Sequence, residues 1–263
     1  PLEQRCNTAV YVLSRISGEG SDRKVVPGDV LLSESEKRDI LALQEMYPVF
    51  LLVLNVGGPV DLSPVVQDVD DILLLSQLGV QTGAVLSDIL LGEAYPSGKL
   101  TTSWVRGGDF CPQAEFGEKE ETHYQEGIYV GYRYYDAAHV KPLFPFGFGL
   151  GYTDFRLEPG AVTLAGEQVT VSAQVRNTGA FSGKEVVQLY LSSPWGALDQ
   201  PAQALAAYGK TRELAPGESC RMELRFKMSD LASFDEARSA YVLEKGDYVL
   251  RCGNSSRKCK PMA

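Results

Sequence analysis

The run Ala9–Leu13 (AVYVL) passes directly into Ser14–Arg23 (SRISGEGSDR), and this junction decides the fold of the first half of the chain. An apolar, β-branched run of this kind predicts a buried parallel strand that delivers a polar loop at its carboxyl end. Open α/β sheets place their ligand sites at that end of the strands. Glycines on both sides of Glu19 remove side-chain bulk, which leaves its carboxylate the most prominent group of the loop.

Two interpretations of Glu19 stay open on these residues alone. An acidic residue between glycines is commonly a solvated turn without chemistry. The functional alternative is a carboxylate held in a defined position, with the charged residues Arg15, Asp22 and Arg23 fixing the loop by charge-assisted hydrogen bonds.

The segment after this loop alternates helices and strands. Ser33–Glu36 predicts a helix start, because its serine is a good N-cap and its last glutamate completes a capping box. The unbroken apolar run Val49–Val56 predicts a central parallel strand. Further helices are expected over Val65–Leu78 and Gln81–Leu91. This order predicts a parallel sheet covered by helices.

Asp70 and Asp71 raise the question of a catalytic carboxylate pair. Val69, Ile72 and Leu73 flank them at helical spacing, so the edge of a solvated helix is the preferred interpretation.

The chain changes character in its second half. Residues 105–123 have the composition of a surface loop or linker, and His123 is expected on that surface. Gln125–Asp136 is dense in tyrosine and alternates like a β ribbon, which favours a packed hairpin over a platform that stacks on sugar rings. From Thr153 onward, about seven short alternating strands separated by turns predict a β-sandwich of immunoglobulin-like type.

Composition excludes several classes of partner. A net charge of −9 and a pI near 4.9 argue against nucleic acid and anionic membranes, because their partners need clustered Lys and Arg. Five cysteines without Cys-x-x-Cys spacing, with two histidines, argue against a structural zinc site. We therefore expect no metal and no cofactor, and the glycines of Gly147–Gly151 lack the strand and helix that a dinucleotide loop needs.

The cysteines leave one alternative open. Free thiols are the default expectation, whereas Cys252 and Cys259 would close a small loop in an oxidising compartment. The odd cysteine count and the lack of a signal-peptide pattern favour the cytoplasm. Because Pro1 follows no initiator methionine, we expect this chain to be a segment of a longer polypeptide.

Several strings, in one order along the chain, resemble glycoside hydrolase family 3, the β-glucosidase and β-xylosidase family. They are Arg15–Arg23 (RISGEGSDR), Leu91–Trp104 (LGEAYPSGKLTTSW), Glu126–Asp136 (EGIYVGYRYYD), Pro145–Phe155 (PFGFGLGYTDF), and Asn177–Gly179, Gly183–Leu191 (GKEVVQLYL) and Leu214–Ser219 in the last part.

The resemblance implies a domain division and a site. It places a partial α/β-sandwich domain over 1–104, a linker with the aromatic ribbon over 105–151, and a fibronectin type III-like domain over 152–263. Glu19 takes the position of the general acid/base, and Arg15, Ser17, Asp22 and Arg23 are the residues expected to position the loop or contact substrate.

The resemblance also implies what lies outside these residues. Enzymes of this type carry the nucleophilic Asp on a TIM barrel, and this sequence has no (β/α)₈ repeat. A retaining glycosidase needs a nucleophilic carboxylate and a carboxylic acid about 5–5.5 Å apart. The expected partners are a β-linked glycoside or oligosaccharide and the barrel of the same enzyme, with a homo-oligomer left open. The alternative function is a non-catalytic carbohydrate-binding or scaffold module.

Overall fold

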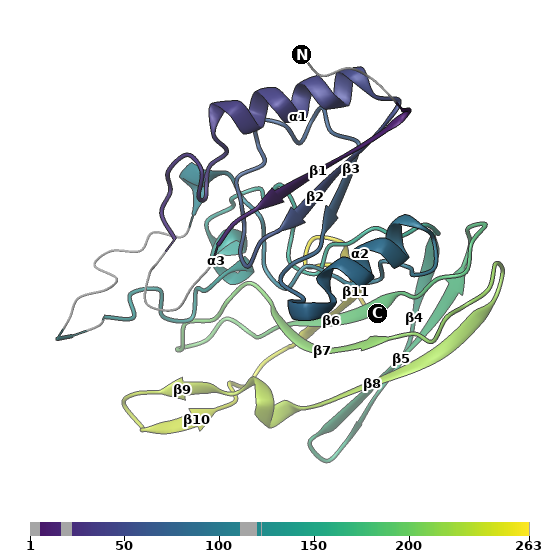
Figure 1. The fold of residues 1–263 in the computed structure, drawn as a ribbon. Coiled ribbons are helices and arrows are strands. Elements are labelled where there is room, and N and C mark those ends of the chain that lie inside the picture. The colour runs from purple at the N-terminus through teal and green to yellow at the C-terminus, as the bar shows by residue number, and fades with distance from the viewer. Residues whose placement is uncertain (1–5, 17–22, 111–119, 122, 263) are drawn as a thin grey trace. The chain divides into compact units, whose positions relative to one another are not determined.

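The structure is a computed structural model that describes residues 6–16, 23–110, 120–121 and 123–262. The chain divides into two compact units. The α/β unit comprises residues 1–94, 104–110 and 141–144, and the sandwich unit comprises 95–103, 111–140 and 145–263. The expected fold class, a parallel α/β part followed by an immunoglobulin-like sandwich, is confirmed (Figure 1).

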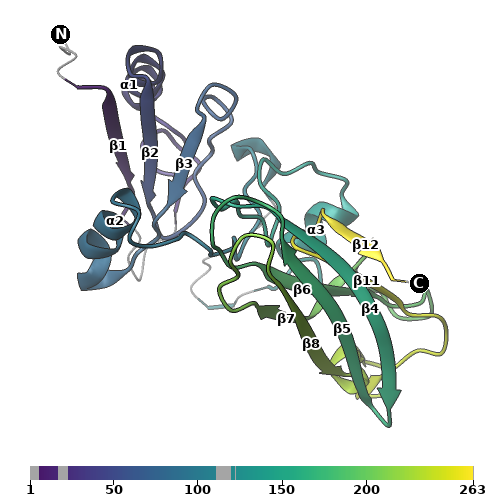
Figure 2. The same cartoon turned by 90° about the vertical axis from the view of Figure 1, so that its right-hand side faces the viewer.

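The α/β unit is built on a parallel sheet in the order β1-β2-β3. Its strands are β1 (Thr8–Ser14), β2 (Val49–Asn55) and β3 (Asp71–Leu74), and Figure 2 shows them side by side. The central strand β2 carries Leu52, Val53 and Leu54 at 2% exposure or less, as expected for a strand covered on both faces.

Helix α1 (Glu34–Met46) begins as the sequence predicts. The Ser33 hydroxyl accepts from the Glu36 amide at 3.3 Å, and the Glu36 carboxylate accepts from the Ser33 amide at 2.8 Å. Ile40 is fully buried on the face that the helix turns to the core. Helix α2 (Thr82–Leu90) also forms where expected.

We expect Ser33→Ala to lower the free energy of unfolding by about 1 kcal/mol, because it removes the N-cap acceptor of α1. Thermal or denaturant unfolding of the chain measures this loss. Ser87→Ala, at an exposed serine inside α2, is the matched control and should change stability by less than about 0.5 kcal/mol. Equal effects of the two substitutions would contradict a stabilising cap.

The prediction of a helix over Val65–Leu78 is wrong. The segment makes turns and then forms strand β3, whose Asp71–Leu74 pair with Leu51–Leu54 of β2. The consecutive apolar residues of Ile72–Leu75 extend the sheet by one parallel strand, and this pairing overrides the helical spacing. Asp71 therefore lies exposed on a strand, and Asp70 accepts a hydrogen bond from the Gln44 side chain at 3.2 Å.

The sandwich unit packs two antiparallel sheets around one apolar core. One sheet has the order β4-β5-β8, with β4 (Phe155–Ala165), β5 (Gln168–Asn177) and β8 (Ser219–Lys227). The other has the order β12-β11-β6-β7, with β6 (Val186–Ser192), β7 (Ala204–Lys210), β11 (Val249–Gly253) and β12 (Cys259–Pro261). A hairpin joins β9 (Ser233–Asp235) to β10 (Ala240–Val242).

The prediction of a β ribbon over Gln125–Asp136 is also wrong. Tyr132–Ala137 form helix α3, which follows Gly131 at φ +60°, a backbone angle that favours glycine. Tyr132 stacks on Phe146 at a centroid distance of 4.7 Å and accepts a hydrogen bond from the Leu205 amide at 2.8 Å. One turn of helix brings tyrosines three positions apart to the same side, which a strand cannot do.

Among the described residues, the cysteines form no disulfide, and the cysteines and histidines form no metal site. Cys252 and Cys259 are free thiols, although they lie on the paired strands β11 and β12. Burial raises the pKa of the Cys252 thiol to about 11, so it stays protonated at neutral pH. His123 is exposed and its ring nitrogen lies 3.9 Å from Glu121. Within the described ranges, no group of three or more His, Cys, Asp or Glu is placed to hold a metal ion. The helices of these ranges include none with the length and apolar character of a membrane span.

Candidate active site

The site expected from the sequence follows β1 at the carboxyl end of the parallel sheet. Glu19, Ser17 and Asp22 lie outside the described residues. Arg15 and Arg23 are described, and they stand four positions before and four positions after Glu19 in the sequence. The structure therefore describes the residues on either side of the Glu19 segment, Arg15 before it and Arg23 after it.

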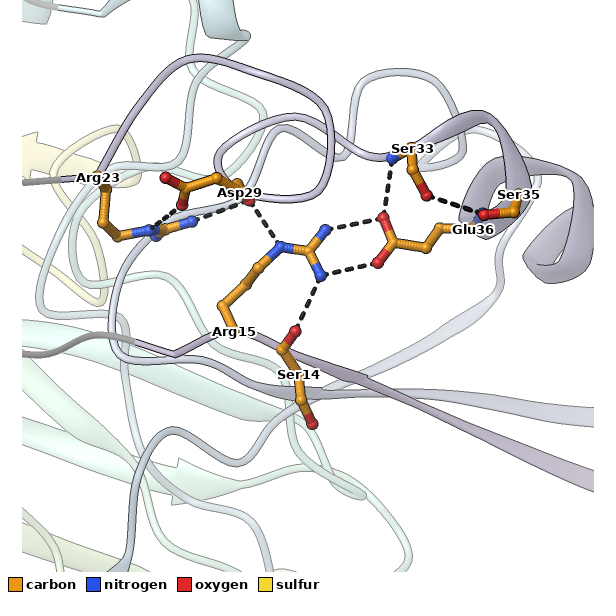
Figure 3. Close-up of polar contacts among 7 residues, drawn as sticks. All are labelled: Ser14, Arg15, Arg23, Asp29, Ser33, Ser35 and Glu36. Atoms are coloured by element: carbon orange, nitrogen blue, oxygen red, sulfur yellow. Dashed lines mark hydrogen bonds and ion pairs between the residues drawn. The ribbon is translucent and has the colours of Figure 1, made fainter.

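Arg15 anchors the first end of this segment. It directly follows β1, and its amide donates to the Asn55 carbonyl at 3.2 Å, which extends the pairing with β2 by one bond. Its guanidinium makes a bidentate ion pair with the Glu36 carboxylate, with both N–O distances at 2.8 Å (Figure 3). Its Nε donates to the Asp29 carbonyl at 2.7 Å. At 8% exposure, Arg15 is a buried cation.

Arg23 anchors the second end. Its Nε donates to the Asp29 carboxylate at 2.8 Å, and a terminal nitrogen donates to the Asp29 carbonyl at 3.0 Å (Figure 3). The other terminal nitrogen donates to the Pro59 carbonyl at 2.7 Å, in the loop that follows β2. The guanidinium thus binds two segments that the chain separates widely.

Asp29 is the residue on which both arginines converge. Its carbonyl accepts from Arg15 and from Arg23, while its carboxylate accepts from Arg23 and, at 2.6 Å, from the Lys24 amide. We call these residues, Arg15, Arg23, Asp29 and Glu36, the clamp. Through Asp29, the clamp links Arg15 and Arg23, the two residues that flank segment 16–22.

The carboxylates of the clamp are ionised at neutral pH. Burial alone would raise the pKa of Glu36, but hydrogen bonds from Arg15 and from the Ser33 amide hold it below its usual range. Burial likewise opposes ionisation of Asp29, and the bonds from the Lys24 amide and Arg23 outweigh it, so its pKa is also lowered. Each arginine therefore faces a full negative charge.

Asp61 fixes the neighbouring loop after β2. It is buried, its carboxylate accepts from the Ser63 amide at 2.9 Å and from the Gly107 amide at 2.8 Å, and its own amide donates to Val30. A Cβ on Gly107 would lie 2.5 Å from a methyl group of Leu31, so a larger residue here would require the Leu31 side chain to move. The loops at this end of the sheet are thus held by charged and backbone contacts.

Sequence reasoning named the two arginines but not their acceptors. Asp29 lies in an ordinary Pro-Gly-Asp turn and offers no motif. The sequence indicates Glu36 only as a capping-box residue, although the carboxylate that caps α1 also binds Arg15. The one available signal was the presence of two arginines that need acceptors within a short loop.

Comparison with known proteins agrees with this architecture. A family model for the glycosyl hydrolase family 3 C-terminal domain matches residues 3–152, and one for a fibronectin type III-like domain matches residues 185–256. The fold is thus that of the C-terminal region of a glycosyl hydrolase. The chain belongs to glycosyl hydrolase family 3.

The relatives that this chain matches are longer proteins. Beta-glucosidase A of Butyrivibrio fibrisolvens is 36% identical over 95% of this chain and 36% of its own length. The structure of β-glucosidase 3B from Thermotoga neapolitana, solved in complex with α-D-glucose, is 41% identical with a TM-score of 0.89, over 97% of this chain and 37% of that one. The structure of a β-glucosidase from Paenibacillus barengoltzii is 36% identical with a TM-score of 0.91, over 98% of this chain and 30% of that one. The present chain spans about a third of the length of these relatives.

Proposed function

We propose that the chain is part of a retaining β-glycosidase of the β-glucosidase type, which hydrolyses terminal β-linked glucosyl or xylosyl residues. Membership of family 3 supports the β-glycosidase class, and the relatives named β-glucosidase support its glucosyl specificity. The partners in this proposal are a β-linked glycoside or oligosaccharide and a TIM-barrel domain of the same enzyme.

In this proposal Glu19 is the general acid/base. It protonates the glycosidic oxygen as the bond to the anomeric carbon breaks, and it then takes a proton from the water that hydrolyses the covalent glycosyl-enzyme. The nucleophile is an Asp of the barrel, outside this chain. In the proposed site, the negative charge of that nucleophile favours the protonated form of the acid when the glycoside binds.

The observation that carries the proposal is the clamp. A solvated turn needs no buried anchors, whereas a general acid/base must be held within hydrogen-bond reach of one oxygen atom. Arg15 and Arg23 both bind Asp29 and so fix the two ends of the segment that contains Glu19. Ser17 and Asp22 are proposed to position this segment or contact substrate from within it.

Exposed apolar side chains beside the clamp support a covering domain. Ile16 is 96% exposed directly after Arg15, and Val25 and Val26 are 52% and 45% exposed directly after Arg23 and Lys24. Apolar side chains gathered beside a polar site are typical of a surface that another domain covers. The barrel of the same enzyme is the occupant that the family membership favours.

The 263-residue chain alone is expected to give no burst and no turnover with a chromogenic β-glucoside, because it lacks the nucleophile of the double displacement. Incubation of the purified chain with 4-nitrophenyl β-glucoside, followed by absorbance, tests this. The complete enzyme is the positive control. Steady hydrolysis by the chain that is lost in Glu19→Ala would show that the nucleophile lies within these residues.

The alternative function is a non-catalytic carbohydrate-binding or scaffold module that keeps the fold without the chemistry. The full-length gene separates the two proposals. A barrel with a suitably placed Asp favours the enzyme, and a full-length gene without one favours the module.

A further inference from the structure

We infer that Asp29 is a positioning residue for the general acid/base: it holds Arg15 and Arg23 together and so fixes the place from which Glu19 acts. This inference rests on the proposed function. It concerns a residue with no place in the expected site, and it follows from contacts of the described residues alone.

The first step of the argument is the sharing of one acceptor. Two guanidinium groups donate to the same Asp29 carbonyl oxygen, at 2.7 Å from Arg15 and 3.0 Å from Arg23. Two guanidinium charges at one oxygen repel each other, and a carboxylate paired with each arginine offsets this repulsion. Glu36 neutralises Arg15, and the Asp29 side chain neutralises Arg23.

The second step is the difference between the two arms of the clamp. The first arm, the pair Arg15–Glu36, is held by secondary structure, because Arg15 extends the pairing of β1 and Glu36 belongs to the first turn of α1. In the Arg23 arm, by contrast, Arg23, Asp29 and Pro59 lie outside helices and strands, and Arg23 is held by the Asp29 carboxylate and by the carbonyls of Asp29 and Pro59. The Asp29 carboxylate is therefore the group whose removal releases one end of the Glu19 segment while the other end stays fixed.

The third step is the local turn that presents Asp29. The Asp29 carboxylate accepts from the Lys24 amide, and the Val30 amide donates to the Lys24 carbonyl, so residues 24–30 form a closed turn. The Asp61 amide bonds to the Val30 carbonyl at 2.8 Å and ties this turn to the loop after β2. Asp29 thus connects Arg23, which follows the Glu19 segment, to the loop at the carboxyl end of β2.

The test compares leaving groups in the complete enzyme. Asp29→Ala should lower kcat on cellobiose or an alkyl β-glucoside by about 10- to 100-fold, the range expected for a displaced catalytic group. Formation of the covalent intermediate from 2,4-dinitrophenyl β-glucoside, which needs little protonation, should change by less than threefold, an expectation that follows from the weak demand for acid catalysis. Azide should partly restore turnover of the activated substrate, as it does for a missing base.

Matched variants make the result specific. Asp29→Asn keeps an oxygen acceptor for Arg23 or the Lys24 amide and should fall between wild type and Asp29→Ala. Asp39→Ala removes a partly exposed carboxylate of α1 that pairs with Arg38 and should leave all three measurements unchanged. If Asp29→Ala does not fold, Arg23→Lys is the second variant, because lysine keeps the charge but loses the fork that reaches both Asp29 and Pro59.

The outcomes separate this inference from the proposed function. An equal loss for good and poor leaving groups in Asp29→Ala, while Glu19→Ala shows the leaving-group dependence, would overturn the positioning role alone. An equal loss in Glu19→Ala would overturn the acid/base assignment, and the positioning role with it. A leaving-group dependence in both variants, with azide rescue in both, supports the inference.

Discussion

Glu19→Ala in the complete enzyme is expected to slow hydrolysis of alkyl β-glucosides and disaccharides by roughly 10²–10⁴-fold, the usual contribution of general acid/base catalysis. These substrates have poor leaving groups, so protonation of the glycosidic oxygen carries much of the barrier. With an activated aryl glycoside the first step needs little protonation, and the covalent intermediate should form at close to the normal rate. Its hydrolysis should be slow, because water then lacks a base.

The measurement is pre-steady-state and steady-state hydrolysis of one activated aryl glucoside and one alkyl glucoside. A burst followed by slow turnover, which azide accelerates, is the expected signature, since azide attacks the intermediate without a general base. Glu34→Ala, at an exposed carboxylate of α1 that pairs with Lys37, is the matched control. A small, equal loss for both substrates without azide rescue would contradict the acid/base role of Glu19 and indicate that it is a turn residue without a catalytic role.

Local rules account for the elements that the sequence predicted correctly. The capping box at Ser33 and the apolar run of β2 are decided by groups within a few residues of one another, so α1 and β2 begin where expected. Local rules do not identify strand Asp71–Leu74 or helix Tyr132–Ala137, because their partners lie elsewhere in the chain. The strand pairs with β2, and Tyr132 of the helix stacks on Phe146 and accepts a hydrogen bond from the Leu205 amide.

The candidate site shows the same division. The sequence indicated Arg15 and Arg23 because both flank Glu19 within one short string. Their acceptor Asp29 and the carboxylate of Glu36 follow Arg15 by 14 and 21 positions, and only the folded sheet end brings them together. The functional roles of Glu19, Arg15, Ser17, Asp22 and Arg23, and the domain boundaries at 104 and 151, stay predictions.

The second large effect concerns a buried ion pair of the sandwich unit. The Lys99 ammonium lies 2.7 Å from the Glu185 carboxylate, and their side chains are 13% and 9% exposed. Lys99 also donates to the Gly149 carbonyl at 2.6 Å, so it ties segment 95–103 to the segment that precedes β4. Glu185 accepts further hydrogen bonds from the Val186 amide and the Asn254 side chain, at 2.7 and 3.2 Å.

We expect Lys99→Met to lower the free energy of unfolding by about 3–5 kcal/mol, because it leaves the Glu185 carboxylate buried without its counter-ion. Denaturant unfolding of the 263-residue chain measures the loss, and Lys37→Met, at a surface pair with the largely exposed Glu34, is the control with an expected cost below about 1 kcal/mol.

A double-mutant cycle with Glu185→Gln separates the pair from the rest of the network. Once the negative charge at residue 185 is gone, the buried carboxylate no longer lacks a counter-ion, so Lys99→Met should cost at least about 1 kcal/mol less in the Glu185→Gln background than in the wild type. The bond to Gly149 is lost in both backgrounds and cancels from the difference. Additive effects of the two substitutions would show that Lys99 stabilises the unit through Gly149 and packing, and that its charge contributes nothing through Glu185.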